Sequence, residues 1–317
     1  MKKISLLFIL WLTGVNYCDA QHNLDSLLPV RGICMAAPEP KGVDKFIEFV
    51  NDALVPRKLN TIVLRIDYRY QYKSRPELIS DNALSESDVK KIVRACKAGG
   101  IKIIPQVNML GHQSWYANVG KLLEAYPEFN ETPEIPTDQE ISWPNQWGLY
   151  CLSYCPLHPK VHEVVFDVID EIVEVFEADA FHAGMDEVFF LGMDERCRGR
   201  DNAELFAGEV TTIRNHLASN GKKLWIWGDR LIDGKTTGIG LWEASYNNTH
   251  RAIDMIPKDV VINDWHYERP DPTAAYFALK GFQVITCPWR FPEVTKKQLH
   301  MMVDFKQGAT AAVRDNY

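Results

Sequence analysis

The sequence lacks the features of a chain that binds nucleic acid or spans a membrane. Of its 317 residues, 35 are Lys or Arg and 42 are Asp or Glu, so the formal net charge is −7, and no basic block occurs. Proteins that bind polyanions concentrate Lys and Arg on one face, which argues against a nucleic-acid partner. After residue 20, no segment reaches the roughly 20 apolar residues of a transmembrane helix. With 46% hydrophobic and 24% charged content, the composition is that of an ordinary globular protein.

Cysteine is sparse, and its spacing excludes the framework of a small disulfide-stapled domain. Cys151, Cys155 and Cys197 are candidates to bridge neighbouring loops, with buried free thiols as the alternative. The C-x3-C spacing has no second matching pair, which disfavours zinc. His158 and His162 stand four residues apart, but no H-E-x-x-H arrangement accompanies them. The sequence therefore predicts neither a metal site nor a cofactor.

The N-terminus has the pattern of a secretory signal over residues 1–20. Met1-Lys2-Lys3 supplies the positive start, and an apolar run and a short polar stretch follow it as far as Ala20. We expect cleavage after Ala20, which leaves a mature domain over residues 21–317 in the periplasm or the medium. Lipid attachment at Cys18 is disfavoured, because a bulky tyrosine precedes it where such sites normally have a small residue.

Short β-branched or apolar runs alternate with longer segments of helical period from residue 30 onward. The alternation is typical of βα units wound into a parallel sheet, and seven units predict an α/β fold of the TIM (β/α)8-barrel type. The expected strands cover residues 30–35, 61–66, 102–107, 180–184, 223–227, 260–264 and 282–286. The expected helices cover residues 43–53, 86–98, 161–176, 203–218, 250–256, 272–279 and 295–305.

The eighth strand that such a barrel needs has little sequence left to form it. Only residues 310–313 remain for it before Tyr317. Two alternatives stay open at this stage: a short tail closes the barrel poorly, or the chain is truncated before the strand. No internal repeat or linker is visible, so a single domain is expected.

Asp186 and Glu187 stand side by side after an apolar, strand-like segment. Two carboxyl groups in one small pocket cannot both ionise freely, so one retains its proton and can act as a general acid near neutral pH. Where a strand ends and the backbone turns, adjacent side chains can reach the same cavity. The pair therefore suits cleavage of a glycosidic bond. An exposed Asp-Glu pair is the alternative, and the buried-looking surroundings disfavour it.

Three segments carry a family resemblance. The run His182-Ala183-Gly184-Met185-Asp186-Glu187 resembles the H-x-G-x-D-E signature of the family 20 glycoside hydrolases, the β-N-acetylhexosaminidases. The segment 105–112 resembles that family's strand end in P-G-H, with Leu110 in place of the proline. The run Trp225-Ile226-Trp227-Gly228-Asp229 is similar to the tryptophan-bearing strand beyond the acidic pair. The segments follow the family's order.

The resemblance implies a retaining, substrate-assisted mechanism, in which the 2-acetamido oxygen attacks its own anomeric carbon and forms an oxazolinium intermediate. Glu187 would protonate the departing oxygen and then activate water. Asp186 would accept a hydrogen bond from the acetamido N–H. His112 matches a histidine that tunes the acid, with Asp67 as its expected backing partner; a purely structural histidine is the alternative.

The resemblance also implies residues that surround the sugar. Trp227 and Trp265 are candidate walls around the acetamido methyl, and Tyr246 is a candidate donor to the acetamido carbonyl. His182 is expected to support the pocket rather than to touch the sugar. Core packing is the alternative for each of the aromatic residues. The first strand lacks the family's sugar-gripping arginine at its end, and Asn108 stands where many members have aspartate.

The segment 113–160 is long for a single βα connection, and long ordered insertions are usually functional. Aromatic faces stack on sugar rings, so its aromatic residues are candidate subsite walls. A small core of the loop's own is the alternative for at least two of them. They are Trp115, Tyr116, Trp143, Trp147 and Tyr150.

The leading functional hypothesis is an exported glycoside hydrolase that removes β-linked N-acetylhexosamine from oligosaccharides or glycoconjugates. A competing hypothesis is a catalytically impaired glycan-binding protein on the same barrel scaffold. A third is another barrel hydrolase, such as a deacetylase or a metal enzyme.

Overall fold

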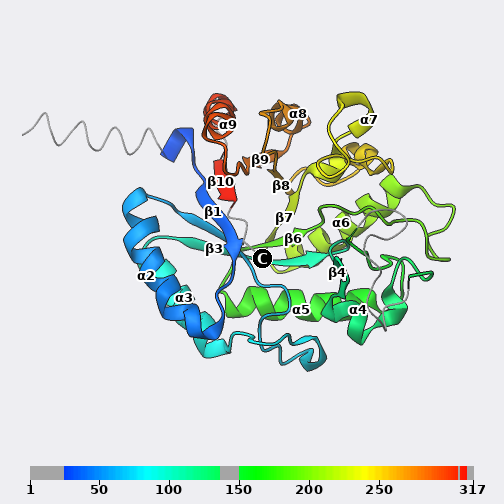
Figure 1. Cartoon of the computed structure of the whole chain (residues 1–317), viewed down its shortest axis with the longest axis horizontal. Helices are drawn as coiled ribbons and strands as arrows, with labels where there is room; N and C mark the ends of the chain where they lie inside the picture. The colour runs from blue at the N-terminus through cyan, green and yellow to red at the C-terminus, as the bar shows by residue number, and fades with distance from the viewer. Residues whose placement is uncertain (1–24, 136–149, 306–307, 313–317) are drawn as a thin grey trace, which may run out of the picture.

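The structure, a computed structural model, describes residues 25–135, 150–305 and 308–312. Eight parallel strands close into a barrel in the order β1-β2-β3-β6-β7-β8-β9-β10, with β10 returning to β1. The strands lie at the centre of Figure 1 with the helices outside them. They are β1 (Arg31–Ala36), β2 (Thr61–Arg65), β3 (Lys102–Met109), β6 (Ala180–Gly184), β7 (Lys223–Trp227), β8 (Val261–Asp264), β9 (Gln283–Thr286) and β10 (Gly308–Ala312). The predicted barrel is confirmed, and β4 (Ser114–Trp115) and β5 (Asn118–Val119) form a small separate hairpin.

The eighth strand, left open by the sequence, is present. β10 pairs in parallel with β1, where Gly32 lies opposite Thr310, and with β9, where Gly308 lies opposite Ile285. A Cβ atom at Gly308 would lie 2.4 Å from the Cβ of Val30, so only glycine fits this close approach. The barrel is closed, and an incomplete eighth strand does not describe it.

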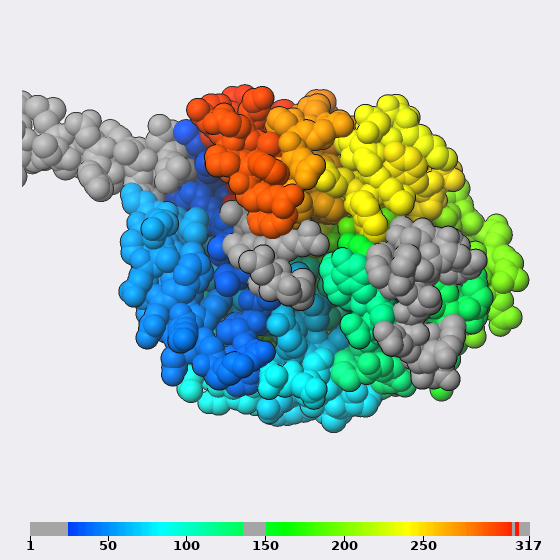
Figure 2. Space-filling view, in the orientation of Figure 1, coloured from blue at the N-terminus to red at the C-terminus, as the bar shows by residue number. Residues whose placement is uncertain are grey.

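The helices follow the strands in chain order around the barrel. In Figure 2 the colours run from blue through cyan, green and yellow to orange around the molecule, as expected of βα units wound about one axis. The α-helices are α2 (Val43–Phe49), α3 (Glu86–Ala98), α4 (Lys121–Ala125), α5 (Val161–Val175), α6 (Asn202–Ser219), α7 (Gly234–Thr237), α8 (Thr273–Leu279) and α9 (Pro292–Phe305). The short helical turns are η1 (Pro40–Gly42), η2 (Val50–Leu54), η3 (Val55–Arg57), η4 (Pro76–Leu78), η5 (Pro127–Phe129), η6 (Asp229–Leu231) and η7 (Thr249–Asp254).

Local signals account for where α3 begins and which face it buries. Ser85 accepts a hydrogen bond from the backbone N–H of Asp88, whose side chain accepts in return from the backbone of Ser85. This capping box satisfies two of the free N–H groups at the helix start. Val89, Ile92, Val93 and Cys96 are buried, which is the spacing of one helical face.

Two predicted helices differ from the structure. The segment expected as a helix over 43–53 is an α-helix that continues as the π-turn η2. The segment expected over 250–256 is the 3₁₀ turn η7, which starts after Asn248 in the left-handed region (φ 70°) and stops short of Pro257. Proline lacks the N–H that a continuing helix needs and disfavours helical geometry in the residue before it.

Packed side chains fill the inside of the barrel. A cluster of buried residues there includes Trp225, Trp227 and Trp265 together with aliphatic residues from the strands. The interior is therefore a core, and room for chemistry is expected at the strand ends. Among the described residues, none of the helices combines the length and the apolar character needed to cross a membrane.

Candidate active site

Several polar residues gather at the carboxyl ends of neighbouring barrel strands. His112 follows β3, Asp186 and Glu187 follow β6, and Asp229 follows β7. This end of a TIM barrel carries the active site in characterised barrel enzymes.

The backbone after β6 is twisted so that consecutive carboxylates serve one site. Gly184, Met185 and Glu187 all have left-handed φ angles, of 66°, 67° and 49°. Across from them, Leu110 and His112 have φ angles of 61° and 54°. Each such non-glycine residue costs on the order of 1–3 kcal/mol and persists where the surroundings impose it, which is common at functional sites.

Gly111 lets the β3 and β6 loops close on each other. A Cβ atom at this position would lie 2.7 Å from the backbone oxygen of Asp186 and 3.0 Å from a methyl group of Val188. The two loops are therefore in backbone contact, and a larger residue would push His112 away from the carboxylates.

His112 bridges the acidic pair. Its Nε2 lies 3.2 Å from Asp186 Oδ2 and 3.2 Å from Glu187 Oε2. The side chains of His112, Asp186 and Glu187 are only 12%, 17% and 8% exposed. The carboxylates are thus held together around one imidazole and shielded from bulk water.

Two residues from the connection between β3 and α5 complete the group. The Tyr150 hydroxyl donates to Glu187 Oε2 at 2.8 Å. The Cys151 sulfur lies 3.4 Å from His112 Nδ1 and 3.6 Å from Glu187 Oε2. His112, Tyr150, Cys151, Asp186 and Glu187 are called the acid cluster below.

The electrostatics of the acid cluster favour a protonated His112. Burial raises the pKa of Cys151 to about 12, so this thiol stays neutral at physiological pH. Burial also lowers the pKa of His112, but the neighbouring Cys151 and Asp186 outweigh this effect and raise that pKa well above its ordinary value. In turn, burial raises the pKa of Asp186, and the charge and hydrogen bond of His112 outweigh this and lower it. Asp186 and His112 therefore form an ion pair next to Glu187.

A third carboxylate supports the backbone of the pair. Asp229 Oδ2 accepts a hydrogen bond from the Glu187 backbone N–H at 3.0 Å and one from Arg230 Nε at 2.6 Å. Trp265 Nε1 donates to Asp229 Oδ1 at 3.4 Å. Burial raises the pKa of Asp229 to about 6, Arg230 opposes this, and Asp186 adds to it.

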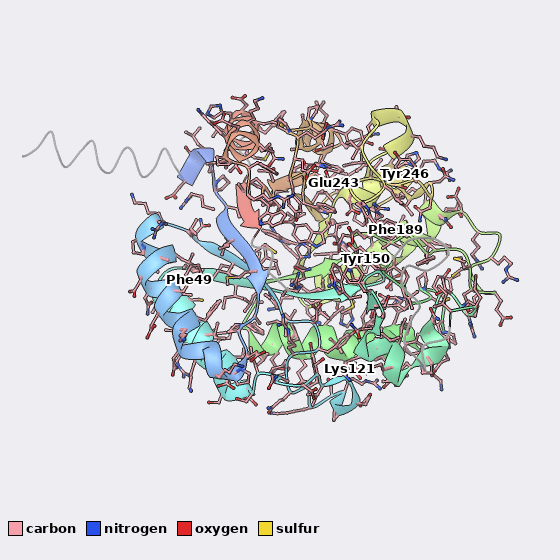
Figure 3. All side chains as sticks on the ribbon, in the orientation of Figure 1. Phe49, Lys121, Tyr150, Phe189, Glu243 and Tyr246 are labelled. Carbon is pink, nitrogen blue, oxygen red and sulfur yellow. The ribbon has the colours of Figure 1, made fainter. Side chains whose placement is uncertain are left out.

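Arg230 connects Asp229 to the loop that contains Leu241 and Trp242. The fully buried guanidinium donates to the backbone oxygens of Leu241 and Trp242, each at 3.0 Å. Trp242 stacks on Tyr150 with ring centroids 4.7 Å apart, and Phe189 meets Trp242 edge-on at 4.9 Å. Figure 3 shows Tyr150 and Phe189 in the same part of the molecule, far from Phe49 and Lys121. An unbroken set of contacts therefore runs from Asp229 to the Tyr150 hydroxyl on Glu187.

Aromatic residues of the long connection pack on one another. Tyr150 lies 4.4 Å from Trp115 and 5.1 Å from Tyr116, measured between ring centroids, and Trp115 stacks on His112 at 5.8 Å. These rings form a small aromatic group at the rim of the acid cluster. Trp143 and Trp147 lie outside the described residues.

Three predicted binding residues lie close to the acid cluster. Trp227 and Trp265 are buried in the barrel core, and Trp265 reaches the cluster through Asp229. His182 is fully buried, its Nδ1 accepts from the Gly184 backbone N–H at 3.0 Å, and its ring lies 4.5 Å from Trp227. Burial lowers the pKa of His182 to about 3, so this ring is neutral. Its supporting role in the pocket stays a prediction.

Asp67 and Tyr246 are not brought to the acid cluster by any contact that the structure records. Asp67 Oδ1 accepts from the Asn108 backbone N–H at 3.0 Å, while Cys151 occupies the Nδ1 side of His112. The Tyr246 hydroxyl donates to the backbone oxygens of Gly234 and Ile239. Figure 3 shows Tyr246 near α7 and apart from Tyr150. Their predicted roles as histidine partner and acetamido donor find no support in this arrangement.

A second group of ligand-type side chains lies nearby. Among the described residues, two groups of three could hold a metal ion: His112, Cys151 and Glu187, and a fully buried group of Glu131, Cys155 and Cys197. The latter is called the buried cluster below. The cysteines from Cys34 to Cys287 are all free thiols, so the loop-bridging disulfide that the sequence left open is not formed here.

Three members of the site escaped the sequence analysis. Tyr150 stood among candidate sugar walls, Cys151 among candidate disulfide partners, and Asp229 within a quoted motif without a role. Each acts through a partner at least 36 residues away in the chain, because the contacts join Tyr150 and Cys151 to Glu187, and Asp229 to Glu187. The only signal in the sequence was that Asp229 stands two residues after the end of its strand, as Asp186 does.

Comparisons with known proteins agree on one family. The family model described as "Glycosyl hydrolase family 20, catalytic domain" matches residues 47–306. The chain is 24% identical over 238 residues to a beta-hexosaminidase of Emericella nidulans, covering 68% of this chain and 36% of that protein. It is 23% identical over 241 residues to a lacto-N-biosidase of Bifidobacterium bifidum, covering 71% of this chain and 18% of that one.

Solved structures share the fold. The chitobiase of Flavobacterium johnsoniae superposes with a TM-score of 0.61 at 18% identity, over 90% of this chain and 44% of that one. A structure described as a beta-N-acetylhexosaminidase gives a TM-score of 0.64 at 17% identity, over 90% of this chain and 66% of that one. The chain thus spans well under half the length of the two relatives compared by sequence.

Proposed function

The chain belongs to glycosyl hydrolase family 20, and from this premise we propose that it removes β-linked N-acetylhexosamine from oligosaccharides or glycoconjugates. The proposed mechanism is retaining and substrate-assisted: the acetamido oxygen of the bound sugar displaces the aglycone and forms an oxazolinium intermediate, which water then opens.

One observation carries the proposal: the two oxygens of Asp186 are in different states. Oδ2 faces the His112 imidazole at 3.2 Å, whereas the buried Oδ1 accepts no hydrogen bond from any described residue. A buried acceptor without a donor is costly, so a ligand donor is expected there. The N–H of an acetamido group supplies one, and the negative charge of Asp186 would stabilise the positive charge that develops on the acetamido group during attack.

Glu187 is the proposed acid and base. Oε2 is held by Tyr150 at 2.8 Å and lies 3.2 Å from His112 Nε2, which orients the carboxyl group. It would donate a proton to the glycosidic oxygen as the C–O bond breaks, and then take a proton from the water that attacks the anomeric carbon. Because the attacking acetamido oxygen and the anomeric carbon belong to the same substrate, the first step has the rate advantage of an intramolecular reaction.

Replacing the acid tests the activity. Glu187→Gln should lower kcat for an aryl N-acetyl-β-glucosaminide by roughly 10²–10⁴-fold, because general acid–base catalysis contributes about this much. Glu204→Gln, at an exposed position on α6, is the matched control and should leave the rate unchanged. Equal rates for both variants would reject Glu187 as the acid.

The nucleophile is tested separately through the substrate. In a series of aryl glycosides with N-acetyl, N-fluoroacetyl and N-trifluoroacetyl groups, kcat should fall with each added fluorine, because the acetamido oxygen becomes a poorer nucleophile. A rate independent of fluorination would exclude participation of the acetamido group while leaving glycosidase activity intact.

The glycan-binding alternative was motivated by a missing eighth strand. Because β10 closes the barrel, that motive is gone. If calorimetry showed sugar binding while the assay above gave no product, the glycan-binding alternative would be favoured again.

We also propose export, on the strength of the signal-like residues 1–20. Expression in a Gram-negative host should give a mature protein that begins at Gln21 and is released by osmotic shock. Intact-mass analysis of the periplasmic fraction checks this, and an unprocessed chain found only in the cytoplasm would contradict it.

A further inference from the structure

The buried cluster has the composition of a metal site. Glu131, Cys155 and Cys197 are each 0% exposed, and one ligand atom from each lies within 4.8 Å of the others. The two sulfurs are 3.4 Å apart. Asp194 Oδ1 lies 3.4 Å from the Cys155 sulfur, so a fourth donor stands at the edge of the group. These side chains are not used in the glycosidase chemistry proposed above.

Glu131 gives the independent indication of a ligand. Oε1 accepts hydrogen bonds from the backbone N–H groups of Gly192, Met193 and Asp194, at 2.6, 2.9 and 3.4 Å. Oε2 is buried and accepts no hydrogen bond from any described residue. A buried carboxylate so firmly oriented through one oxygen, with its other oxygen beside two thiols and without an N–H or O–H donor, has the setting of a cation ligand.

We propose that Glu131, Cys155 and Cys197 bind one zinc ion, with Asp194 as the nearest fourth ligand. Thiolates with a carboxylate suit zinc, which prefers four tetrahedral ligands at about 2.3 Å from sulfur and about 2.0–2.2 Å from oxygen. Two sulfurs on such an ion are roughly 3.7 Å apart, close to the separation found here.

The competing explanation is a disulfide between Cys155 and Cys197. It would require the sulfurs to approach to about 2.05 Å, and it would leave Glu131 Oε2 without a partner. A zinc ion satisfies all three side chains at once. The Cys197 thiol and burial raise the pKa of Cys155, and burial raises that of Glu131. Zinc reverses this preference for the protonated forms, because it binds the deprotonated ligands and releases their protons.

The proposed ion would join the two loops that carry the acid cluster. Cys155 lies four residues after Cys151, in the connection between β3 and α5, and Cys197 lies ten residues after Glu187, between β6 and α6. Zinc at the buried cluster would therefore hold Tyr150 and Cys151 against Glu187. Its role would be structural, because no member of the buried cluster is within hydrogen-bonding distance of the acid cluster in the described contacts.

Metal analysis of the full-length protein, purified under mild reduction without chelators, is the direct test. We expect one zinc per chain by elemental analysis. Cobalt exchanged into the site should give the near-ultraviolet thiolate-to-metal absorption and the intense visible bands of a tetrahedral ion. Removal of the metal by a strong chelator should lower the Tm by several degrees, with recovery on adding zinc.

Variants locate the ion. Cys155→Ser and Cys197→Ser should each lose the zinc, and Glu131→Gln should weaken its retention against a competing chelator at least tenfold. Two matched control variants should keep the zinc. Cys96→Ser changes a buried thiol of α3, and Cys151→Ser changes the other group of possible metal ligands, that of His112, Cys151 and Glu187.

Three results would overturn the proposal. One is a metal-free protein whose peptide map shows Cys155 joined to Cys197. Another is zinc retained in both Cys155→Ser and Cys197→Ser, and the third is zinc lost from Cys151→Ser alone. If the cysteine variants do not fold, the zinc content and the cobalt spectrum of the unaltered protein decide.

Discussion

The acid cluster and the buried cluster lie in the same two connections and both combine carboxylates with thiols, yet they differ in exposure and in how their oxygens are used. In the acid cluster, His112 and Asp186 retain 12% and 17% exposure, and Glu187 Oε2 is held by side chains alone. In the buried cluster every ligand is inaccessible, and Glu131 is held by backbone N–H groups.

The difference teaches which cluster can do chemistry. A catalytic carboxyl group must be reached by substrate and must change its protonation state, so movable side-chain partners and partial exposure suit it. A carboxylate fixed by backbone groups in a closed interior is suited to holding structure together. Substitutions should therefore separate the two clusters, with activity lost in one and stability in the other.

Among the substitutions that compare the two clusters, the matched pair Asp186→Asn and Asp194→Asn should have the largest effect. Asp186→Asn should lower kcat on the N-acetyl substrate by roughly 10²–10³-fold, because it removes the charge that stabilises the transition state. Its Tm should change little. Asp194→Asn should do the reverse, with a loss of about 1–3 kcal/mol in unfolding free energy. Kinetics and denaturant unfolding of both variants check this, and parallel losses in both measurements would remove the distinction.

Tyr150→Phe should have the next largest effect. It deletes the hydroxyl that donates to Glu187 Oε2 but keeps the ring that stacks on Trp242. A hydrogen bond to a charged group contributes about 1.5–3 kcal/mol, so kcat should fall roughly 10–100-fold. The pH–rate profile should shift as well, whereas a loss of packing alone would leave the profile in place.

His266, which follows β8, provides a smaller, pH-dependent contribution to stability. Burial lowers the pKa of His266, but Asp264 at 3.3 Å and Glu243 at 2.6 Å raise it to about 10. Its unfolded value is about 6.5, so the stabilisation is fully present below that pH and is lost as pH rises toward 10.

The measurement is the unfolding free energy of the wild type and His266→Gln between pH 6 and 10. The variant should be less stable by a few kcal/mol, on the order expected from linkage, at the acid end, and the gap should close as the pH rises. If the difference in unfolding free energy between the two proteins stayed constant over this range, the ion pairs of His266 would make no contribution that depends on its protonation.

Cys151→Ser should have the smallest effect on turnover. Serine keeps a donor beside His112 but is shorter in reach, so we expect a loss of only a few-fold in kcat/KM. Because Cys151 is neutral, thiol reagents should inhibit slowly, and Cys151→Ser should resist them. Rapid inactivation of Cys151→Ser by the same reagent would assign the reactive thiol elsewhere.

The sequence by itself determined the barrel and the place of its acid pair. Strands at 61–66 and 180–184 are marked by apolar, β-branched runs, and His112, Asp186 and Glu187 stand within three residues of the ends of β3 and β6, so strand order alone brings them to one end of the barrel. The left-handed backbone at Met185 and Glu187 lay beyond this reasoning, because neither residue type signals that conformation.

Only the tertiary structure decided which side chains surround that pair. Tyr150 and Cys151 come from a connection without periodicity, so nothing local predicts that they face Glu187, and Asp67 was expected in the place that Cys151 takes. Glu131, Cys155 and Cys197 are separated by 24 and 42 residues, and only loops folded over two barrel strands bring them together. Local sequence patterns specify strands and helices through their period, whereas contacts between irregular loops depend on the closed barrel beneath them.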